Sequence, residues 1–573
     1  MQRDFLLTAE RQKVSIAAVF FCALFSTLTY GLHNSTGPNG SNVQDVWTAG
    51  TGYTGQGVAV GLISQDHARL THEAFAGIDP NNWYDATGHN TYTPSWHDTP
   101  VGGIICSRGG AAYPNDKGAA PDAELYTVKV VYDSGIAPAW IQDALDYLVD
   151  PERQCQVVVT GIALYSTADP IPDGNSIWSL IYDYYAYQHN MVFATASGNF
   201  NPEISVFGDT YNSITTGGLF IDANDVYHQV GAIDGSGSNA GPTHDGRKKP
   251  DIVAPSQKQW FPYVSNDTSW IYIKDVSASY DDRGQTSWAV PHTGGVAAVL
   301  LEYANESAEP NDDQNEVIKA VIVNSALPNI LDKSGNETID RSDPNWPLEI
   351  EAWNTDRGYG RIDAKRAYDI LSSPGITTTQ SKGWTYDSVA SGQPDSYIIK
   401  GAKNKRLVLT LTWNRRVIWT DQKSGLPPKY NGIMELGEIE TFLADLDLEI
   451  NDPNGIPIPL TSSDKDNLEK FDLLLSKTGN YEIKVVAKAD SESANYALAF
   501  ELLDPLEADF NIDYVVNEFD LADFSSFWLD SGCDNSNEPC FPYNLNGNDT
   551  INLVDFSIVA QQWLTYDNRY YSP

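Results

Sequence analysis

The spacing of apolar and polar residues follows two different patterns along this chain of 573 residues. Up to about residue 372, short apolar runs such as 58–63, 157–159 and 191–196 are typical of strands that are buried on both faces. Apolar residues follow helical spacing in stretches such as 141–148. Strands that alternate with helices predict an α/β fold built on a parallel sheet.

From residue 376 to 505 the helical spacing fades and period-two runs take its place. This alternation predicts antiparallel strands, separated by turn sequences such as Asp452-Pro453-Asn454-Gly455. We expect an antiparallel β-sandwich here, which resembles jelly-roll modules. The runs are 406–413, 446–450, 481–485 and 496–500.

A sequence unit that begins at Asp509 recurs from Asn544 in the same register, and each copy ends in a Trp-Leu pair. Both copies carry oxygen-bearing side chains at positions 1, 3, 5, 9 and 12, which is the set that a hard cation needs to replace its water shell. The first copy supplies Asp509, Asn511, Asp513, Asn517 and Asp520, and the second supplies Asn544, Asn546, Asn548, Asn552 and Asp555.

The aspartate at position 12 of each unit resembles dockerins, the paired calcium-loop–helix modules that bind cohesin domains. The resemblance implies calcium as the bound metal, a small α-helical calcium-loop domain, and a cohesin-like docking partner. The second unit has asparagines at positions 1, 3 and 5, so we expect it to bind calcium more weakly than the first.

The N-terminus places Arg3, Arg11 and Lys13 before an apolar stretch at 16–25. This order is typical of a secretory signal peptide, which we predict at 1–32. An uncleaved signal anchor is the alternative, because no Ala-x-Ala cleavage site follows. No other stretch is long and apolar enough to cross a bilayer. We therefore expect a secreted protein, extracellular or associated with the cell surface, with no membrane span after signal removal.

Acidic residues outnumber basic ones by 76 to 36, giving a formal net charge of -40. This balance argues against nucleic-acid binding, which needs basic surface. Five cysteines are present, and Cys22 would leave with the signal. Cys533 and Cys540 are expected to form a disulfide, whereas Cys106 and Cys155 either pair or remain as two buried thiols.

The stretch that carries chemistry is Gly284 to Ala304, where Thr286-Ser287 stands directly before Trp288-Ala289-Val290-Pro291-His292 and an apolar run. A hydroxyl that attacks a carbonyl has to be held rigidly at the start of a buried element. The stretch resembles the Gly-Thr-Ser-x-Ala-x-Pro-His signature of the subtilisin-like serine proteases (subtilases), and Ser287 falls on the nucleophile. Similarity to this family extends from about residue 45 to 372.

Two further segments match the family in the expected order. His97, in Trp96-His97-Asp98-Thr99-Pro100-Val101, lies where subtilases carry the general base, and histidine can take and return a proton near neutral pH. Asn199 follows the apolar run Met191–Ala196, where the family's asparagine donates a hydrogen bond to the oxyanion.

The active face also departs from the family at several positions. Ser64 aligns with the aspartate that orients the catalytic histidine, and either Asp66 takes over that role through a shifted loop or the orienting carboxylate is lost. Asp98 and Gln285 each replace a glycine. Residues 160–164 do not reproduce the family's Asn-x-Ser-x-Gly, and little chain separates the signal from the globular pattern where a folding propeptide is usual.

Two functions follow from this resemblance. The first is a secreted serine endopeptidase that hydrolyses polypeptides through an acyl-enzyme on Ser287, with His97 as base, Asn199 at the oxyanion and Asp66 orienting His97. The alternative is a catalytically inactive subtilase fold that serves as a binding or structural module and is docked through its calcium-loop domain. We place a peptidase domain at 45–375, the sandwich at 376–505 and the calcium-loop domain at 506–573.

Overall fold

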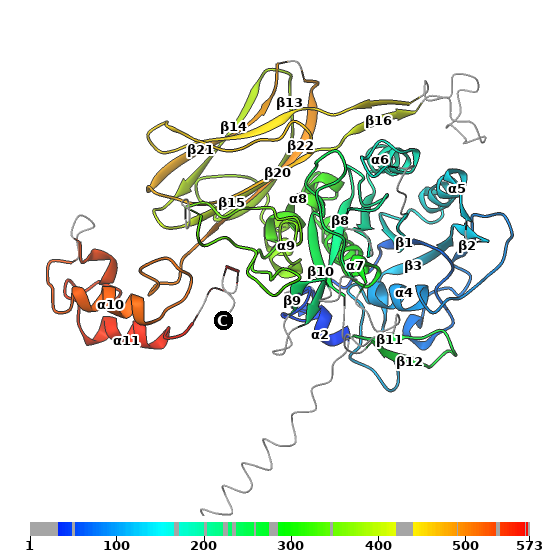
Figure 1. The fold of residues 1–573 in the computed structure, drawn as a ribbon, viewed down its shortest axis with the longest axis horizontal. Helices are drawn as coiled ribbons and strands as arrows, with labels where there is room; N and C mark the ends of the chain where they lie inside the picture. The colour runs from blue at the N-terminus through cyan, green and yellow to red at the C-terminus, as the bar shows by residue number, and fades with distance from the viewer. Residues whose placement is uncertain are drawn as a thin grey trace, which may run out of the picture.

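The structure is a computed structural model (Figure 1). It describes residues 32–48, 52–133, 135–164, 171–199, 203–221, 227–231, 237–256, 259–273, 285–343, 348–419, 439–489, 491–533, 539–565, 567 and 569–570. Residues 1–31, which hold almost all of the predicted signal peptide, lie outside these ranges.

A parallel sheet forms the centre of the first part of the molecule, in the strand order β10-β8-β7-β6-β1-β3-β2, and β9 pairs antiparallel with β8 at one side. The predicted parallel α/β architecture is therefore confirmed. The strands are β1 (Ala59–Ser64), β2 (Trp83–Asp85), β3 (Glu124–Lys129), β6 (Val157–Thr160), β7 (Val192–Ala196), β8 (Ile214–Ile221), β9 (Tyr227–Val230) and β10 (Ile252–Pro255).

Helices cover both faces of this sheet. One face packs on an apolar cluster that includes residues of α4 (Asp98–Cys106), α7 (Thr286–Glu306), α8 (Asn315–Ser325) and α9 (Ala364–Leu371). The opposite face packs on a separate cluster with residues of α5 (Pro138–Val149) and α6 (Ile177–His189). Smaller elements are η1 (Glu73–Phe75) and the hairpins β4–β5 (Val131–Tyr132, Gly135–Ile136) and β11–β12 (Gln259–Pro262, Trp270–Ile273).

The helix that begins with the Thr-Ser pair, α7, is buried along most of its length. Two consecutive glycines let it approach its neighbours closely. A Cβ built on Gly294 would lie 2.2 Å from Val159 Cγ2 on β6, and one on Gly295 would lie 2.5 Å from Ala119 Cβ. The Gly294-Gly295 pair therefore sets how deeply α7 sits against the sheet.

The N-terminal segment is part of the folded body. Leu32 opens α2 (Leu32–Thr36) and is fully buried in the same cluster as α7. Asp116 accepts a hydrogen bond from the backbone N–H of His33, and α3 (Gln44–Thr48) packs against α9. Leu32 thus belongs to the core although it falls inside the predicted signal segment, because its side chain fills the apolar cluster.

Two four-stranded antiparallel sheets follow, as the period-two runs predict, and share one apolar core. One sheet has the order β13-β22-β15-β20 and the other β14-β21-β18-β19. Their strands are β13 (Lys382–Val389), β14 (Pro394–Gly401), β15 (Arg406–Thr412), β18 (Leu446–Asn451), β19 (Pro457–Ile458), β20 (Leu468–Leu474), β21 (Gly479–Ala487) and β22 (Ala494–Leu503), with a hairpin of β16 (Arg416–Trp419) and β17 (Ile439–Phe442) beside them.

The first of these sheets lies against α8 and α9 in Figure 1. Trp384, Leu468, Ala497 and Ala499 belong to the cluster that holds α7, so one core runs across the predicted boundary at residue 375. Arg415 reaches back to α6, where its Nη2 lies 2.5 Å from Asp183 Oδ2 with both side chains buried.

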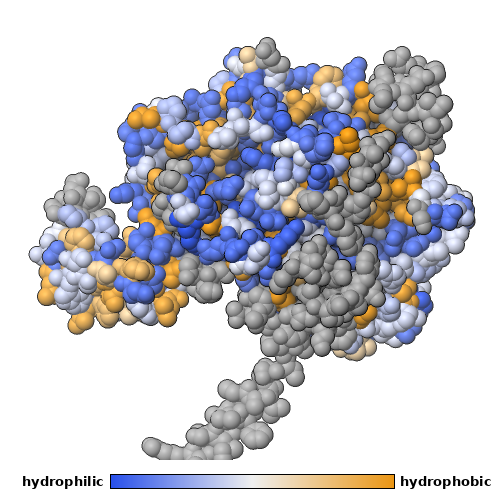
Figure 2. Space-filling model, viewed as in Figure 1, coloured by the Kyte–Doolittle hydropathy of each residue, from blue (hydrophilic) through white to orange (hydrophobic). Residues whose placement is uncertain are grey.

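The C-terminal module contains α10 (Glu518–Ser526), η4 (Phe541–Tyr543) and α11 (Leu553–Gln561) around a small core of its own. It lies apart from the parallel sheet at the end of the chain (Figure 1). Apolar residues gather along its lower edge in Figure 2. The large exposed apolar side chains of this module are Phe519, Trp528, Leu529, Leu553, Val554, Phe556, Trp563 and Leu564.

The cysteines fall into two kinds. Cys533 and Cys540 form the predicted disulfide. Cys106 and Cys155 are free and buried, because they belong to the two apolar clusters on opposite faces of the sheet. Burial raises the pKa of the Cys106 thiol to about 12, so this thiol is protonated at neutral pH.

Among the residues that the structure describes, no helix has both the length and the apolar character needed to cross a lipid bilayer.

Candidate active site

The polar residues that the sequence singles out meet at the carboxyl edge of the parallel sheet. Ser64 is the last residue of β1, and Asn199 lies three residues after the end of β7. His97 is the N-cap of α4, and Ser287 lies in the first turn of α7. Carboxyl ends of parallel strands share one edge, which is where open α/β sheets carry their sites.

Asn199 is fixed directly beside the candidate nucleophile. Its Oδ1 accepts two hydrogen bonds from Thr286, from the backbone N–H at 2.7 Å and from Oγ1 at 2.8 Å. Because Oδ1 is occupied as an acceptor, Nδ2 is the end of this amide that can donate to a developing oxyanion. Asn199 thus contacts the residue that directly precedes Ser287 in the chain.

His97 lies against the start of the same helix. Its ring centroid is 5.4 Å from that of Trp288, the residue that follows Ser287, and Trp288 in turn stacks on Phe261 at 5.2 Å. His97 and Ser287 are both nearly buried, 8% and 6% exposed. Within the described part of the chain, contact between the two runs through the Trp288 ring and not through a hydrogen bond.

The carboxylate beside His97 comes from the next residue in the chain. His97 Nδ1 lies 2.7 Å from Asp98 Oδ1. Ser64 Oγ donates to the same oxygen at 2.5 Å, and the backbone N–H of Asp66 donates to Asp98 Oδ2 at 2.8 Å. A carboxylate can only accept, so the Nδ1 of His97 carries the proton in this contact. The other ring nitrogen, Nε2, is then the acceptor.

Asp98 is fully buried and opens helix α4. Burial alone would raise the pKa of its carboxyl group. The hydrogen bond and charge of His97, together with hydrogen bonds from Ser64 and Ser95, outweigh burial and hold the pKa of Asp98 below its ordinary value. The group is therefore an ionised carboxylate at neutral pH.

The structure places Asp66 elsewhere. Its Oδ1 lies 3.0 Å from Lys129 Nζ and accepts from Thr93 Oγ1 at 2.9 Å. The predicted approach of the Asp66 carboxylate to His97 is not seen, because Lys129 and Thr93 hold that side chain while its backbone N–H faces Asp98.

The sequence held a signal for Asp98 that the interpretation missed. An aspartate is absent at position 64 and present at position 98, where the family has a glycine. Only the packing of α4 against the end of β1 shows that the two positions touch, through Ser64 Oγ and Asp98 Oδ1.

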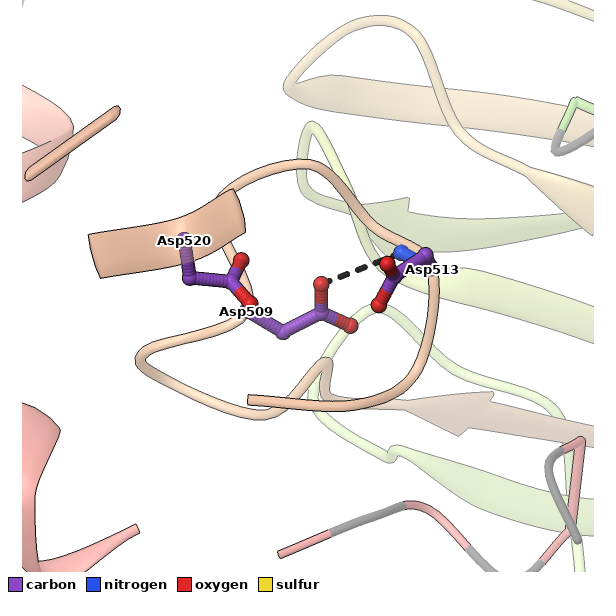
Figure 3. Close-up of side chains that lie close together, drawn as sticks. All are labelled: Asp509, Asp513 and Asp520. Carbon is purple, nitrogen blue, oxygen red and sulfur yellow. Dashed lines mark hydrogen bonds between the residues drawn. The ribbon is translucent and has the colours of Figure 1, made fainter. Parts of the chain in front are cut away.

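A second candidate site lies in the C-terminal module. Carboxylate oxygens of Asp509, Asp513 and Asp520 lie within 4.8 Å of one another (Figure 3). Asn517 caps α10, and Asp520 accepts from its backbone N–H in a capping box. Asn511 Nδ2 donates to Asp513 at 2.9 Å. Burial and the negative charges of Asp520 and Asp513 raise the pKa of Asp509 to about 7.

The second unit repeats this arrangement around α11. Asn552 caps the helix and Asp555 accepts from its backbone N–H, as Asn517 and Asp520 do in the first unit. Asp555 also accepts from Asn546 N–H at 3.0 Å, and Asn544 Oδ1 accepts from Asn548 N–H at 3.1 Å. Asn546 Nδ2 is buried without a hydrogen-bond partner among the described residues.

These donor sets fit a calcium ion unequally. Three crowded carboxylates repel one another, and oxygen donors at this spacing suit a divalent hard cation that neutralises them. The second unit has Asp555 as its carboxylate and otherwise neutral amides, so its field is weaker. The acidic cluster of the first unit is the better fit.

Comparison with known proteins places the main site in context. The model of the peptidase S8 family, described as the subtilase family, matches residues 49–361. Serine protease AprX of Bacillus subtilis (strain 168) is 26% identical over 313 residues, covering 50% of this chain and 65% of AprX. Pyrolysin of Pyrococcus furiosus is 26% identical over 342 residues, covering 54% of this chain and 22% of pyrolysin. The chain thus spans less than two thirds of the length of either relative.

Solved structures give similar matches. The prenylagaramide maturation protease PagA is 17% identical with a TM-score of 0.41, covering 57% of this chain and 98% of PagA. The S41 psychrophilic protease is 20% identical with a TM-score of 0.40, covering 56% of this chain and 96% of that protease. The family model covers more than half of the sequence and includes His97, Asn199 and Ser287, and this chain belongs to the subtilase family.

Proposed function

We propose that this protein is a secreted serine endopeptidase in which Ser287 is the nucleophile and His97 the general base. The observation that carries the proposal is the convergence of an imidazole, an alcohol and a carboxamide at one edge of the sheet. Asn199 holds Thr286 by two hydrogen bonds, and the His97 ring packs on Trp288, so each group contacts a residue that is adjacent to Ser287 in the chain.

The reaction follows from these placements. Ser287 Oγ bonds to the scissile carbonyl carbon while its proton moves to His97 Nε2. Asn199 Nδ2 and the Ser287 backbone N–H stabilise the negative oxygen. His97 then returns the proton to the leaving amine, leaving an acyl-enzyme. Water attacks the acyl carbon and gives its proton to His97, which passes it to Ser287 and frees the acid product.

In this proposal, the hydrogen bond between Ser287 Oγ and His97 Nε2 forms when substrate binds. Catalytic hydrogen bonds are often long in unliganded sites and tighten when substrate excludes water. The stacked Phe261 and Trp288 rings wall the site on the side of α7 and keep the His97 ring in place. Closure of a polypeptide over this face is expected to bring Oγ and Nε2 into contact.

A fluorophosphonate probe tests the proposal directly. We expect the wild-type chain to be labelled and Ser287→Ala to show no labelling, with hydrolysis of an unfolded protein substrate lost in parallel. Asn199→Ala should still be labelled but with kcat lower by about 10²–10³-fold. A folded wild-type chain with neither labelling nor hydrolysis would favour the alternative, a catalytically inactive subtilase fold used as a binding module.

We further infer that residues 506–573 form a calcium-dependent docking module. The acidic cluster of Asp509, Asp513 and Asp520 supports this, as do the apolar side chains exposed on both helices, which fit a cohesin-like partner. Asp509, Asn511, Asp513, Asn517 and Asp520 would hold one calcium ion, and Asn544, Asn546, Asn548, Asn552 and Asp555 a weaker second. Bound calcium would neutralise the carboxylates and order the loop before each helix.

Calorimetric titration of the full chain with Ca²⁺ tests the docking module. Two binding events of unequal affinity are expected, and Asp520→Asn should remove the tighter one. Asp555→Asn at the matching position of the second unit should remove only the weaker one. Absence of heat in the wild-type chain after chelator treatment would contradict calcium binding.

A further inference from the structure

We propose that Asp98 is the positioning carboxylate of this active site, supplied by the residue next to the general base and not by strand β1. The inference rests on the proposed function and names the residue that orients His97. It replaces both readings of the sequence, in which Asp66 took the role or no carboxylate remained.

The geometry supports Asp98 at each of its contacts. Its Oδ1 lies 2.7 Å from His97 Nδ1, within the range of a charge-assisted hydrogen bond. The contact fixes the proton on Nδ1, so Nε2 is left to take the proton of Ser287. As His97 becomes positively charged during the attack, Asp98 stays ionised and stabilises the imidazolium across the same bond. No proton moves to Asp98.

Its surroundings keep the carboxylate rigid. Asp98 is 0% exposed, and its two oxygens accept from Ser64 Oγ and from the backbone N–H of Asp66. The backbone N–H of Asp98 is itself held by Ser95 Oγ at 2.9 Å. A buried carboxylate with each oxygen satisfied has one orientation, which is what a positioning residue needs.

Ser64 occupies the place from which a strand could supply the same group. Its Oγ is 2.5 Å from Asp98 Oδ1, so a carboxylate at position 64 would reach the space that the Asp98 carboxylate now fills. Ser64 and Asp98 therefore contact each other at the point where the site holds its carboxylate. The site then has room for a single carboxylate, and the hydroxyl at position 64 donates a hydrogen bond to it.

Asp66 offers the competing assignment and supplies the control. It is a carboxylate near the same loop, but its side chain is bound to Lys129 and Thr93 and is partly exposed. Asp66→Asn should lower kcat by less than tenfold. Asp98→Asn keeps the size of the side chain while removing its charge, and should lower kcat by about 10³–10⁴-fold with KM changed only a few-fold.

A rescue variant separates positioning from packing. Asp98→Gly should lose activity as Asp98→Asn does, and adding Ser64→Asp to Asp98→Gly should recover at least tenfold in kcat, because a carboxylate again reaches His97 Nδ1. Recovery of stability without kcat, or equal losses at Asp66→Asn and Asp98→Asn, would overturn the proposal. If Asp98→Asn does not fold, the comparison of Asp98→Gly with the double variant Ser64→Asp/Asp98→Gly still tests whether a carboxylate is needed beside His97.

Proton NMR makes the test independent of the proposed activity. The His97 Nδ1–H resonance, assigned by its loss in His97→Gln, is expected far downfield in the wild-type chain and shifted upfield in Asp98→Asn but not in Asp66→Asn. A chain that shows this resonance but is not labelled by the fluorophosphonate probe and does not hydrolyse protein would refute the peptidase proposal. The proposed contact between His97 and Asp98 would still hold. A resonance unchanged in Asp98→Asn would refute the pair itself.

Discussion

The hydroxyl of Ser64 is one of the groups that keep the Asp98 carboxylate ionised, together with His97 and Ser95. It donates to Asp98 Oδ1 from the end of β1, and both residues are fully buried. Removing it in Ser64→Ala leaves a buried carboxylate short of one donor, and hydrogen bonds to charged groups contribute about 1.5–3 kcal/mol. We expect kcat to fall about tenfold and the pKa of Asp98 to rise, with KM unchanged, in steady-state assays across pH.

Thr127→Val is the matched control for Ser64→Ala. Thr127 lies on the neighbouring strand β3, is equally buried, and its Oγ1 accepts from the backbone N–H of Ala68 at 3.0 Å. Loss of this hydroxyl should destabilise the fold in urea by a similar amount but spare kcat. Equal losses of kcat in both variants would show that Ser64 acts only through stability.

At this scale the sequence predicted the residue types of the site but not their partners. Ser287, His97 and Asn199 could be placed because each stands in a local motif next to a strand or helix end. The link from His97 to Asp98 and Ser64 could not, because the direction of a side chain at the start of α4 depends on how that helix packs on β1. Local spacing carries no information about that packing.

Among the elements, α7 tolerates little change where it crosses the sheet. A methyl group at Gly294 would meet Val159 Cγ2 at 2.2 Å, well inside van der Waals contact. We expect Gly294→Ala to lower the free energy of unfolding by about 1–3 kcal/mol, measured in urea. Adding Val159→Ala makes room for the methyl group, so the double variant should be less destabilised than the sum of the two single changes.

The short helix α2 is hydrogen-bonded to the buried carboxyl group of Asp116. Asp116 accepts from His33 N–H, and burial raises its pKa to about 6. A group whose folded pKa is raised contributes stability in full below its unfolded pKa, near 4, and loses that contribution as pH rises through about 6. Urea unfolding between pH 4.5 and 8 should therefore show the wild-type stability falling more steeply than that of Asp116→Asn.

Above pH 7 we expect Asp116→Asn to be the more stable chain, by on the order of 2 kcal/mol, since the amide still accepts the N–H without carrying a charge. Asp122→Asn, an exposed acid on the same connection, should change neither stability nor slope by more than about 0.5 kcal/mol. Parallel pH curves for wild type and Asp116→Asn would contradict this reading of α2.

Most elements could be predicted from periodicity, and the exceptions are instructive. The run at 406–413 became β15 and the stretch at 141–148 became part of α5, because long patterns of one period leave little ambiguity. The helix α2 was missed, because Leu-His-Asn-Ser-Thr has no helical pattern and the burial of Leu32 in the core depends on tertiary contacts.

At the scale of the whole molecule, the parallel-sheet region and the antiparallel sheets contribute residues to one apolar cluster. A buried ion pair also connects these two parts. Arg415 contacts Asp183 on α6 and donates to Gly174 O at 2.5 Å. Arg415→Ala leaves the Asp183 charge buried and unmatched, so we expect a loss of about 3–5 kcal/mol in the free energy of unfolding. Differential scanning calorimetry should show a lower melting temperature for the whole body, with residues 32–503 still melting as one unit.

Arg416 provides the control from the adjacent position. It pairs with Glu492 at 2.6 Å, but both side chains are more than a third exposed. Such pairs contribute about 0–1 kcal/mol, so Arg416→Ala should be nearly silent. Two separate melting transitions in the wild-type chain would show instead that the antiparallel sheets unfold independently. The domain boundary that we predict at residue 375 from the sequence would then also be a boundary in stability.

The contact between Ser64 and Asp98 also limits which side chains these two positions can hold together. A chain without aspartate at either position would lack the carboxylate that orients the His97 imidazole, so we expect it to lose activity. A chain with both would place two carboxylates within hydrogen-bond distance, where they share one proton and one negative charge. Ser64→Asp in this protein creates this double-aspartate form, and we expect it to bind one proton that the wild-type site does not hold.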